Sequence, residues 1–335
     1  MAPPALGPSH CPPRRVYVDL GVNWCNTLQL HDRVPLRWQM KHAGAELSAR
    51  RAPWQVYGFE ASPLIVPYAD RCATALSRGA RLPPPPVPPV GSGNTIELRR
   101  LGASFGCSAV DVGMDAAAAP WASRPKWKFR QALTGKQNRC LIRTLSKNLS
   151  ALRPDPGLSN NLPLLRRRLD GASSCDRPGA HASYTFVPAA AGAHDGEMAV
   201  YGMPEDVLLG GISSTASGRP MGQKMTVPVV NIARWLTTSF TRSDFVVLKM
   251  DVEGAEASII PALVDANATR LIDVFLWECH TSKLPRKPLY KRWPQHSKRT
   301  PCALLERVLT EHGVSIVYLE PYDFQHNSTG RWSDG

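Results

Sequence analysis

This 335-residue sequence lacks the patterns that most directly identify several protein classes. Its eight cysteines form no C-x-x-C pair and no Cys/His ligand spacing, which argues against a structural zinc site. No uninterrupted apolar run reaches about 18 residues and the N-terminus has no apolar signal core, so we expect neither a transmembrane segment nor a Sec signal. The patterns G-x-G-x-x-G and G-x-x-x-x-G-K-[ST] are missing, which disfavours a nicotinamide dehydrogenase and a P-loop site.

The scattered cysteines also bear on the compartment. Cysteines without ligand spacing are most simply explained as reduced thiols, so we expect a cytoplasmic location. The alternative stays open, because an even number of cysteines can pair in a secreted protein. Asn148, Asn267 and Asn327 each begin an N-x-S/T triplet, a pattern that is common by chance.

The chain is strongly basic, with a formal net charge of +13. Such a charge is compatible with nucleic acid, an anionic membrane surface or an acidic substrate. Much of the excess comes from the middle of the chain and from residues 283–299, so it is regional. We therefore do not expect a nucleic-acid partner, and the sequence leaves the oligomeric state open.

Regular patterns occur in two blocks on either side of an irregular middle. Both blocks alternate strands with helices, which predicts an α/β fold with a mostly parallel, doubly wound sheet and an antiparallel edge among the late strands. The middle contains the proline run 83–89 and a predicted helix at 162–169, and we expect it to be partly disordered or to form a small cap. The predicted parts are a disordered lead-in (1–14), a first block (15–78), a Pro/Arg-rich insertion (79–180), a second block (181–320) and a tail (321–335).

Two strand ends in the first block carry polar residues. The strand at 15–20 ends on Asp19 and is followed by Gly21 and Asn23, a loop that can turn backbone N–H groups toward a polar cofactor. The strand at 55–60 ends on Glu60, where nucleoside-binding α/β folds hold ribose hydroxyls. The simpler alternatives are a plain strand-to-helix turn after Asp19 and, for Glu60, a cap on the following helix, a role that Ser62 already fills.

The most informative stretch is VVLKMDVEGAEASIIPAL at 246–263. A short apolar run typical of a buried parallel strand is followed by Asp251, Glu253 and Glu256, and then by a helix. Acidic residues in a first helical turn are often only a solvated, dipole-stabilised face. That explanation suits Glu253 and Glu256 better than Asp251, which follows the strand directly. A further buried strand at 271–280 ends on His280.

These segments together resemble the FkbM family of S-adenosylmethionine-dependent methyltransferases. The resemblance covers residues 14–70 and 181–281 and is most specific in the K-x-D-x-E-G-x-E run. It implies a Rossmann-like methyltransferase fold that binds S-adenosylmethionine and typically methylates a hydroxyl oxygen. The segments that carry it are VYVDLGVNW (16–24), VYGFEASP (56–63), AAAGAHDGEM (189–198), VVNIARWL (229–236), LKMDVEGAEASII (248–260) and LWECH (276–280).

The resemblance also implies site residues on the cofactor side. Asp19, Gly21 and Asn23 match the family's cofactor loop and Glu60 matches its ribose-binding acid. The family loop usually reads Asp-x-Gly-Ala-Asn-x-Gly, whereas this chain has valine in place of the alanine and Cys25 in place of the second glycine. If the backbone φ at Cys25 is positive, we expect its side chain to crowd the methionine part of the cofactor.

On the acceptor side, Asp251 and His280 are the candidate bases that remove the hydroxyl proton. Asp251 can instead hold the acceptor or a divalent ion, and His280 can be merely structural; we assign no metal site. Glu253 and Glu256 are assigned to the acceptor side or to shaping the turn. The expected acceptor is a hydroxylated small molecule, sugar or lipid. The alternative is a catalytically degenerate relative that binds a partner through its basic insertion.

Overall fold

A computed structural model describes most of both predicted blocks. The proline run, the tail and most of the insertion fall outside the described residues, whereas the predicted helix at 162–169 is confirmed as α8 (Leu162–Asp170). The predicted domain boundaries are not tested and stay predictions. The described residues are 13–23, 25–33, 53–62, 65–80, 162–170, 182–202, 223–280, 284–314 and 316–319.

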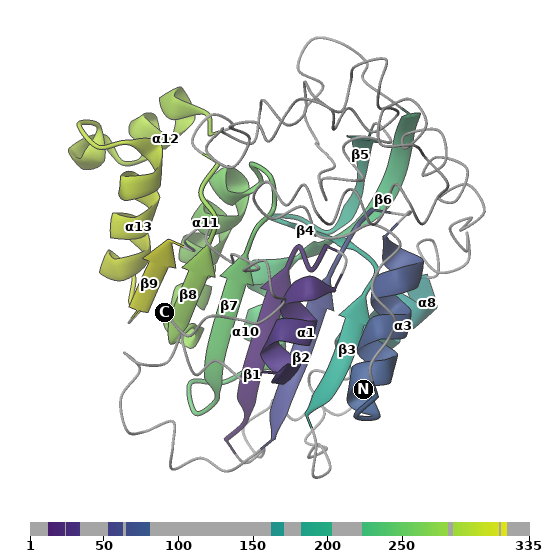
Figure 1. Ribbon diagram of the computed structural model, residues 1–335. Helices are drawn as coiled ribbons and strands as arrows, with labels where there is room; N and C mark the ends of the chain where they lie inside the picture. The colour runs from purple at the N-terminus through teal and green to yellow at the C-terminus, as the bar shows by residue number, and fades with distance from the viewer. Residues whose placement is uncertain are drawn as a thin grey trace, which may run out of the picture. The chain divides into compact units, whose positions relative to one another are not determined.

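The main element is a six-stranded sheet in the order β3-β2-β1-β7-β8-β9 (Figure 1). All five pairings between neighbouring strands are parallel, which confirms the predicted α/β fold. The expected antiparallel edge is wrong, because the last strand runs parallel to β8. The strands are β1 (Arg15–Leu20), β2 (Trp54–Phe59), β3 (Ser183–Val187), β7 (Phe245–Met250), β8 (Val274–Trp277) and β9 (Ile316–Leu319).

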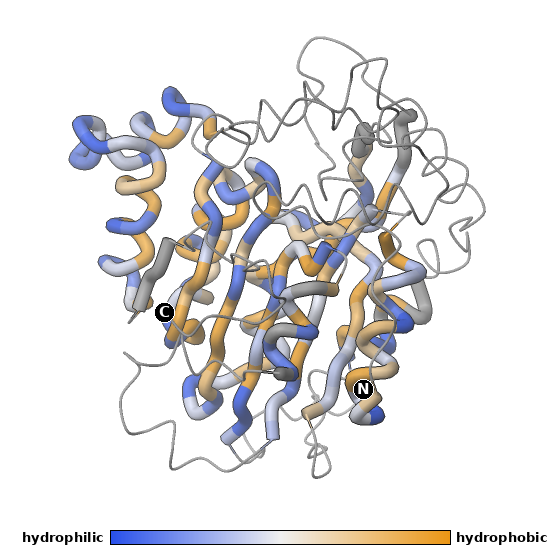
Figure 2. The backbone as a smooth tube through the Cα atoms, in the orientation of Figure 1, coloured by the Kyte–Doolittle hydropathy of each residue, from blue (hydrophilic) through white to orange (hydrophobic). Residues whose placement is uncertain are grey.

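Helices cover both faces of this sheet because its central strands are apolar on both sides. Val16, Val18 and Leu20 of β1 belong to one buried cluster with residues of α10 (Ile232–Ser239) and α11 (Glu256–Asp265). Tyr17 points to the other face and stacks on His31 of α1 (Asn26–Arg33), with 4.7 Å between ring centroids. Figure 2 shows β7 and β8 largely in the hydrophobic colour, as expected for strands covered on both faces.

The remaining elements complete the two blocks. Asn231 caps α10 by accepting a hydrogen bond from the backbone N–H of Arg234. A smaller sheet has the order β4-β6-β5, with β4 parallel to β6. The strand expected over 271–280 is shorter, because a 3-10 turn precedes it. The other bounds are α3 (Val66–Ser77), β4 (Ala190–Gly192), β5 (Gly196–Gly202), β6 (Gln223–Asn231), η6 (Ala268–Leu271), α12 (Arg286–Arg292), η7 (Pro294–His296) and α13 (Pro301–Glu311).

All four cysteines among the described residues are paired, which corrects the expectation of reduced thiols for these positions. Cys25 is bonded to Cys72 of α3, and Cys279, just after β8, is bonded to Cys302 of α13. Which cysteines pair could not be predicted, because the spacings of 47 and 23 residues follow from the packing of elements and not from a local motif. Among the described helices, none is long and apolar enough to cross a membrane.

The chain divides into two compact units, and the six-stranded sheet lies entirely in the unit formed by residues 1–82, 155–199 and 226–320. All residues of the candidate site lie in this unit.

Candidate active site

The candidate site lies where the strand order reverses, between β1 and β7. In open α/β sheets ligands bind outside the carboxyl ends of the strands at such a switch point. The loops that follow the two strands touch here: a Cβ added to Gly21, whose φ is +95°, would lie 2.1 Å from the backbone oxygen of Asp251. Only glycine fits this contact, and it places the predicted cofactor loop directly beside the predicted acceptor-side turn.

Glu60 organises the cofactor side. Its Oε1 accepts hydrogen bonds from the backbone N–H groups of Ala61 (2.9 Å) and Ser62 (2.8 Å), and its Oε2 accepts one from Asn23 (3.0 Å). Burial raises the pKa of Glu60 to about 7, while the three N–H donors oppose this rise. The carboxylate thus joins the loops after β1 and β2, and a carboxylate has about four lone-pair sites, so Oε2 retains room for a hydroxyl donor.

Ser62 was expected to cap the next helix, but its side chain does not do so. The helix α3 begins at Val66 and its N-cap residue, Ile65, makes no side-chain capping bond. The Ser62 hydroxyl is buried and has no hydrogen-bond partner among the described residues. A buried hydroxyl without a partner is costly unless a bound molecule or water satisfies it, so this position next to Glu60 suits a polar ligand.

Asp19 lies inside the protein, beneath the loop. It is in register with Lys249 on β7, and their side chains form a buried ion pair with 3.3 Å between Oδ1 and Nζ. The hydroxyl of Thr27, in the first turn of α1, donates to Oδ2 of Asp19. Both contacts follow from the alternation of the strand, which points Asp19 toward the face covered by α1. Asp19 therefore anchors the loop from below.

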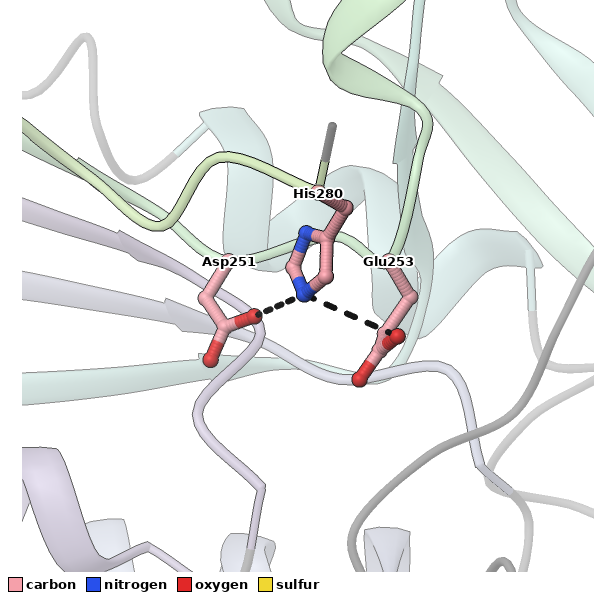
Figure 3. A group of neighbouring side chains, drawn as sticks. All are labelled: Asp251, Glu253 and His280. Carbon is pink, nitrogen blue, oxygen red and sulfur yellow. Dashed lines mark ion pairs between the residues drawn. The ribbon is translucent and has the colours of Figure 1, made fainter. Parts of the chain in front are cut away.

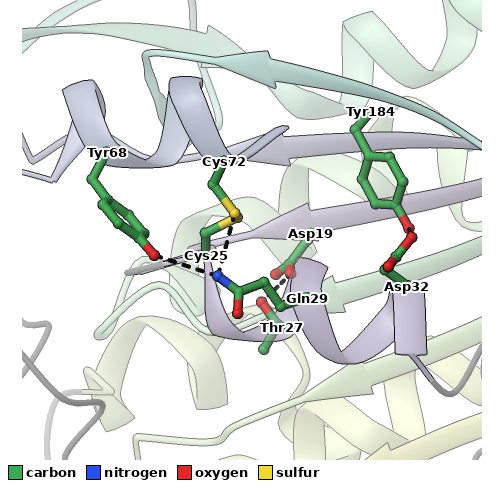
Figure 4. The surroundings of a disulfide bond; sticks show 8 residues. All are labelled: Asp19, Cys25, Thr27, Gln29, Asp32, Tyr68, Cys72 and Tyr184. Carbon is green, nitrogen blue, oxygen red and sulfur yellow. Dashed lines mark hydrogen bonds between the residues drawn. A yellow bond between two sulfur atoms is a disulfide. The ribbon is translucent and has the colours of Figure 1, made fainter. Parts of the chain in front are cut away.

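The loop between β1 and α1 has an unusual backbone that is fixed by a disulfide. Asn23 and Cys25 both have positive φ values, 53° and 64°, so Cys25 adopts the conformation expected of the glycine it replaces. Its side chain is fully buried and is bonded to Cys72 on α3 (Figure 4). The disulfide therefore holds the Cys25 side chain against α3. It links the loop after β1 to the helix that follows β2.

On the acceptor side, His280 is surrounded by carboxylates. Its Nε2 lies 3.7 Å from Oδ1 of Asp251, 3.7 Å from Oε2 of Glu253 and 3.4 Å from Oε1 of Glu278. Figure 3 shows Asp251 and Glu253 on either side of this nitrogen. Its Nδ1 lies 2.7 Å from Oε1 of Glu256, the first residue of α11. The site residues predicted after β7 and β8 therefore lie close together in the structure.

Electrostatics distinguishes the two candidate bases. Burial lowers the pKa of His280, but the hydrogen bonds with Glu256 and Glu278 outweigh it and raise that pKa to about 10. The His280 ring is therefore the positively charged imidazolium at neutral pH. Burial raises the pKa of Asp251 to about 6, against the opposing effect of Lys249. Asp251 is consequently ionised at neutral pH with a basicity closer to the working range than an ordinary aspartate has.

Glu253 and Glu256, both predicted to lie on the acceptor side or to shape the turn, occupy different environments. Glu256 is fully buried and holds His280, whereas Glu253 has a one-third exposed side chain and a positive φ of 56°. Glu278 was not among the predicted site residues. Its signal was its place two residues before His280, at the end of the same strand. Its backbone N–H continues the sheet by donating to the carbonyl of Met250.

A family model described as the methyltransferase FkbM domain matches residues 131–313, more than half of the chain. The match contains β3 through α13 and the whole cluster around His280, while Asp19, Gly21, Asn23 and Glu60 lie before it. No curated protein and no solved structure matched the chain.

Proposed function

Because the chain belongs to the FkbM methyltransferase family, whose members use S-adenosylmethionine, we propose that it methylates a hydroxyl oxygen of a small molecule, sugar or lipid. The observation that carries this proposal is the position of Asp251. It is the first residue after β7, its backbone touches the cofactor loop at Gly21, and its carboxylate faces His280. A base in this place lies between the cofactor side and the acceptor side.

The residues of the cofactor side fit S-adenosylmethionine. Glu60 would accept a ribose hydroxyl through Oε2, and the Ser62 hydroxyl offers a second polar contact at the same strand end. Gly21 and Asn23 supply the close backbone of the loop, and Asp19 would position that loop through Thr27. The disulfide supports this assignment because it turns the Cys25 side chain toward α3.

S-adenosylmethionine supplies a methyl group on a sulfonium sulfur, so transfer forms the O–CH3 bond and breaks S–CH3 with the electron pair left on sulfur. The chain has to hold the acceptor hydroxyl in line and take up its proton. Asp251 would accept that proton, a contribution of about 10²–10⁴-fold in such reactions. His280 would orient Asp251 and balance its charge, and Glu253 would face the acceptor. Positioning itself can lower the barrier by roughly 7–11 kcal/mol in favourable cases.

The test is a transfer assay with S-adenosylmethionine labelled in its methyl group and a panel of sugars, lipids and small alcohols. We expect label in an acceptor that has a free hydroxyl and none in its O-methylated counterpart. Calorimetry with S-adenosylmethionine alone is run beside it. Absence of both binding and transfer, together with salt-dependent binding to a polyanion, would favour the non-catalytic alternative.

The disulfides Cys25–Cys72 and Cys279–Cys302 favour an oxidising compartment over the cytoplasm, because such bonds persist mainly outside reducing compartments. Mass spectrometry of the native protein, alkylated without a reductant, tests this. We expect linked peptides for the pairs Cys25–Cys72 and Cys279–Cys302. Alkylation of these four cysteines would restore the cytoplasmic prediction.

A further inference from the structure

The point enclosed by Asp251, Glu253 and His280 has the form of a cation site. One ligand atom from each residue lies within 4.8 Å of the other two, and Nε2 of His280 lies 3.7 Å from an oxygen of each acid. Ligands bound about 2.0–2.2 Å from a common ion are themselves roughly 3–4 Å apart. A small adjustment of the side chains would therefore bring all three atoms to a shared ion.

The second nitrogen of His280 is arranged as in metal-binding histidines. Nδ1 lies 2.7 Å from Oε1 of Glu256, whose side chain is fully buried. A carboxylate on the far nitrogen fixes the ring orientation and makes the other nitrogen a better ligand. Because Glu256 begins α11 and His280 follows β8, this contact depends on the packed fold and directs Nε2 at the two acids.

The charge of the cluster also favours a cation. Four carboxylates, from Asp251, Glu253, Glu256 and Glu278, lie within 3.7 Å of the ring nitrogens of one histidine. Lys249, the cation nearest to Asp251 along the chain, is paired with Asp19 below the cluster. A divalent cation would take the place of the proton on Nε2 and neutralise more of this charge.

We propose that Asp251, Glu253 and His280 bind one divalent cation, of the class that accepts mixed oxygen and imidazole ligands, such as Mn²⁺ or Zn²⁺. The side chains of Asp251 and Glu253 are 32% and 33% exposed, so the site is open on one side for a further ligand. This further ligand would be the acceptor hydroxyl, an assignment that rests on the proposed function. Binding to the ion makes the hydroxyl proton more acidic. In Figure 3 the second oxygen of Asp251 points away from His280, which leaves it available to receive the proton.

The test uses the full chain, stripped with EDTA and titrated with MnCl2 in the absence of S-adenosylmethionine and acceptor, with free Mn²⁺ measured by electron paramagnetic resonance. We expect one saturable site per chain. Asp251→Asn and Glu253→Gln should each weaken binding at least ten-fold. The control Glu197→Gln removes an exposed carboxylate from β5 and should leave binding unchanged. Thermal unfolding of each variant identifies any that fails to fold, and Glu253, at the exposed turn, then carries the test alone.

The proposal would be overturned if the wild-type chain bound neither Mn²⁺ nor Zn²⁺ saturably, or if both site variants bound Mn²⁺ as tightly as the wild-type chain. The outcome is separable from that of the proposed function. A chain that binds Mn²⁺ and transfers no methyl group keeps the cation site and loses the proposed function. Methyl transfer that continues at the same rate in EDTA keeps the proposed function and overturns the role of the cation in holding the acceptor.

Discussion

The two sides of the candidate site are built from different interactions. On the cofactor side, one carboxylate, Glu60, gathers three backbone N–H groups from two loops. On the acceptor side, four carboxylates surround one imidazole, His280, and the contacts join side chains. Each side also has a disulfide next to it, at Cys25 in the first loop and at Cys279 in the second.

This difference indicates that one side of the site serves cofactor binding and the other serves the transfer reaction. A loop held by backbone hydrogen bonds has a fixed shape and can present the same surface to an invariant cofactor. A cluster of like charges is instead poised to change with what it binds, whether a proton, a cation or an acceptor. Variants on one side should therefore alter cofactor affinity, and variants on the other should alter turnover.

The largest expected effect is that of Asp251→Asn on turnover. The amide cannot take the hydroxyl proton, so we expect the transfer rate with the best acceptor of the panel to fall by about 10²–10⁴-fold. Affinity for S-adenosylmethionine, measured by calorimetry, should change little. A loss of cofactor affinity as large as the loss of rate would contradict the separation of the two sides.

The second effect concerns stability. The Cys25–Cys72 and Cys279–Cys302 bonds close loops of 47 and 23 residues, for which chain entropy predicts about 4 and about 3 kcal/mol of stabilisation. We expect Cys72→Ala and Cys302→Ala to lower the free energy of unfolding in denaturant by amounts of this order, each compared with wild type. Only Cys72→Ala should also weaken binding of S-adenosylmethionine, because it releases the loop of Asn23. Equal effects on cofactor binding would show that the disulfides act only through global stability.

Glu60→Gln should weaken binding of S-adenosylmethionine by about 10–100-fold, because a hydrogen bond to a charged acceptor is worth roughly 1.5–3 kcal/mol. Isothermal titration calorimetry measures the change, with Glu197→Gln as a control that removes an exposed carboxylate. Unaltered affinity in Glu60→Gln would remove this residue from the cofactor site.

The smallest effect is the dependence of cofactor affinity on pH. With a pKa of about 7, raised by burial, Glu60 is mostly ionised at pH 8 and mostly protonated at pH 6. The ribose hydroxyl requires the ionised form, so affinity should fall by about ten-fold from pH 8 to pH 6. Calorimetry across this range should show a flat profile for Glu60→Gln. The same slope in that variant would assign the titration to another group.

Much of the fold could be predicted because its signals are local. The apolar runs before Asp251 and His280, and the alternation of strands with helices, predicted the parallel sheet and the acids at its carboxyl edge. The strand edge was misjudged because β9 is short and its direction depends on α13, which returns the chain to the same end of the sheet. Most of the insertion lies outside the described residues.

The site was predicted less completely than the fold. Asp251 and His280 do meet, as their places at the ends of neighbouring strands implied. The Asp-x-Gly motif did not predict the ion pair between Asp19 and Lys249, because this pair depends on the register of β1 against β7. The disulfides and the role of Glu278 were likewise outside the reach of spacing alone.

The sequence by itself determined the order of the strands along the chain, the mostly parallel character of the sheet and the carboxylates that follow β2 and β7. These depend on hydrophobic periodicity and on residues next to one another. Only the tertiary structure decided that Glu256 holds His280 across 24 residues and that Cys25, in a glycine's conformation, is tied to Cys72. Such contacts arise when helices pack on the two faces of the sheet, and a one-dimensional pattern does not contain that placement.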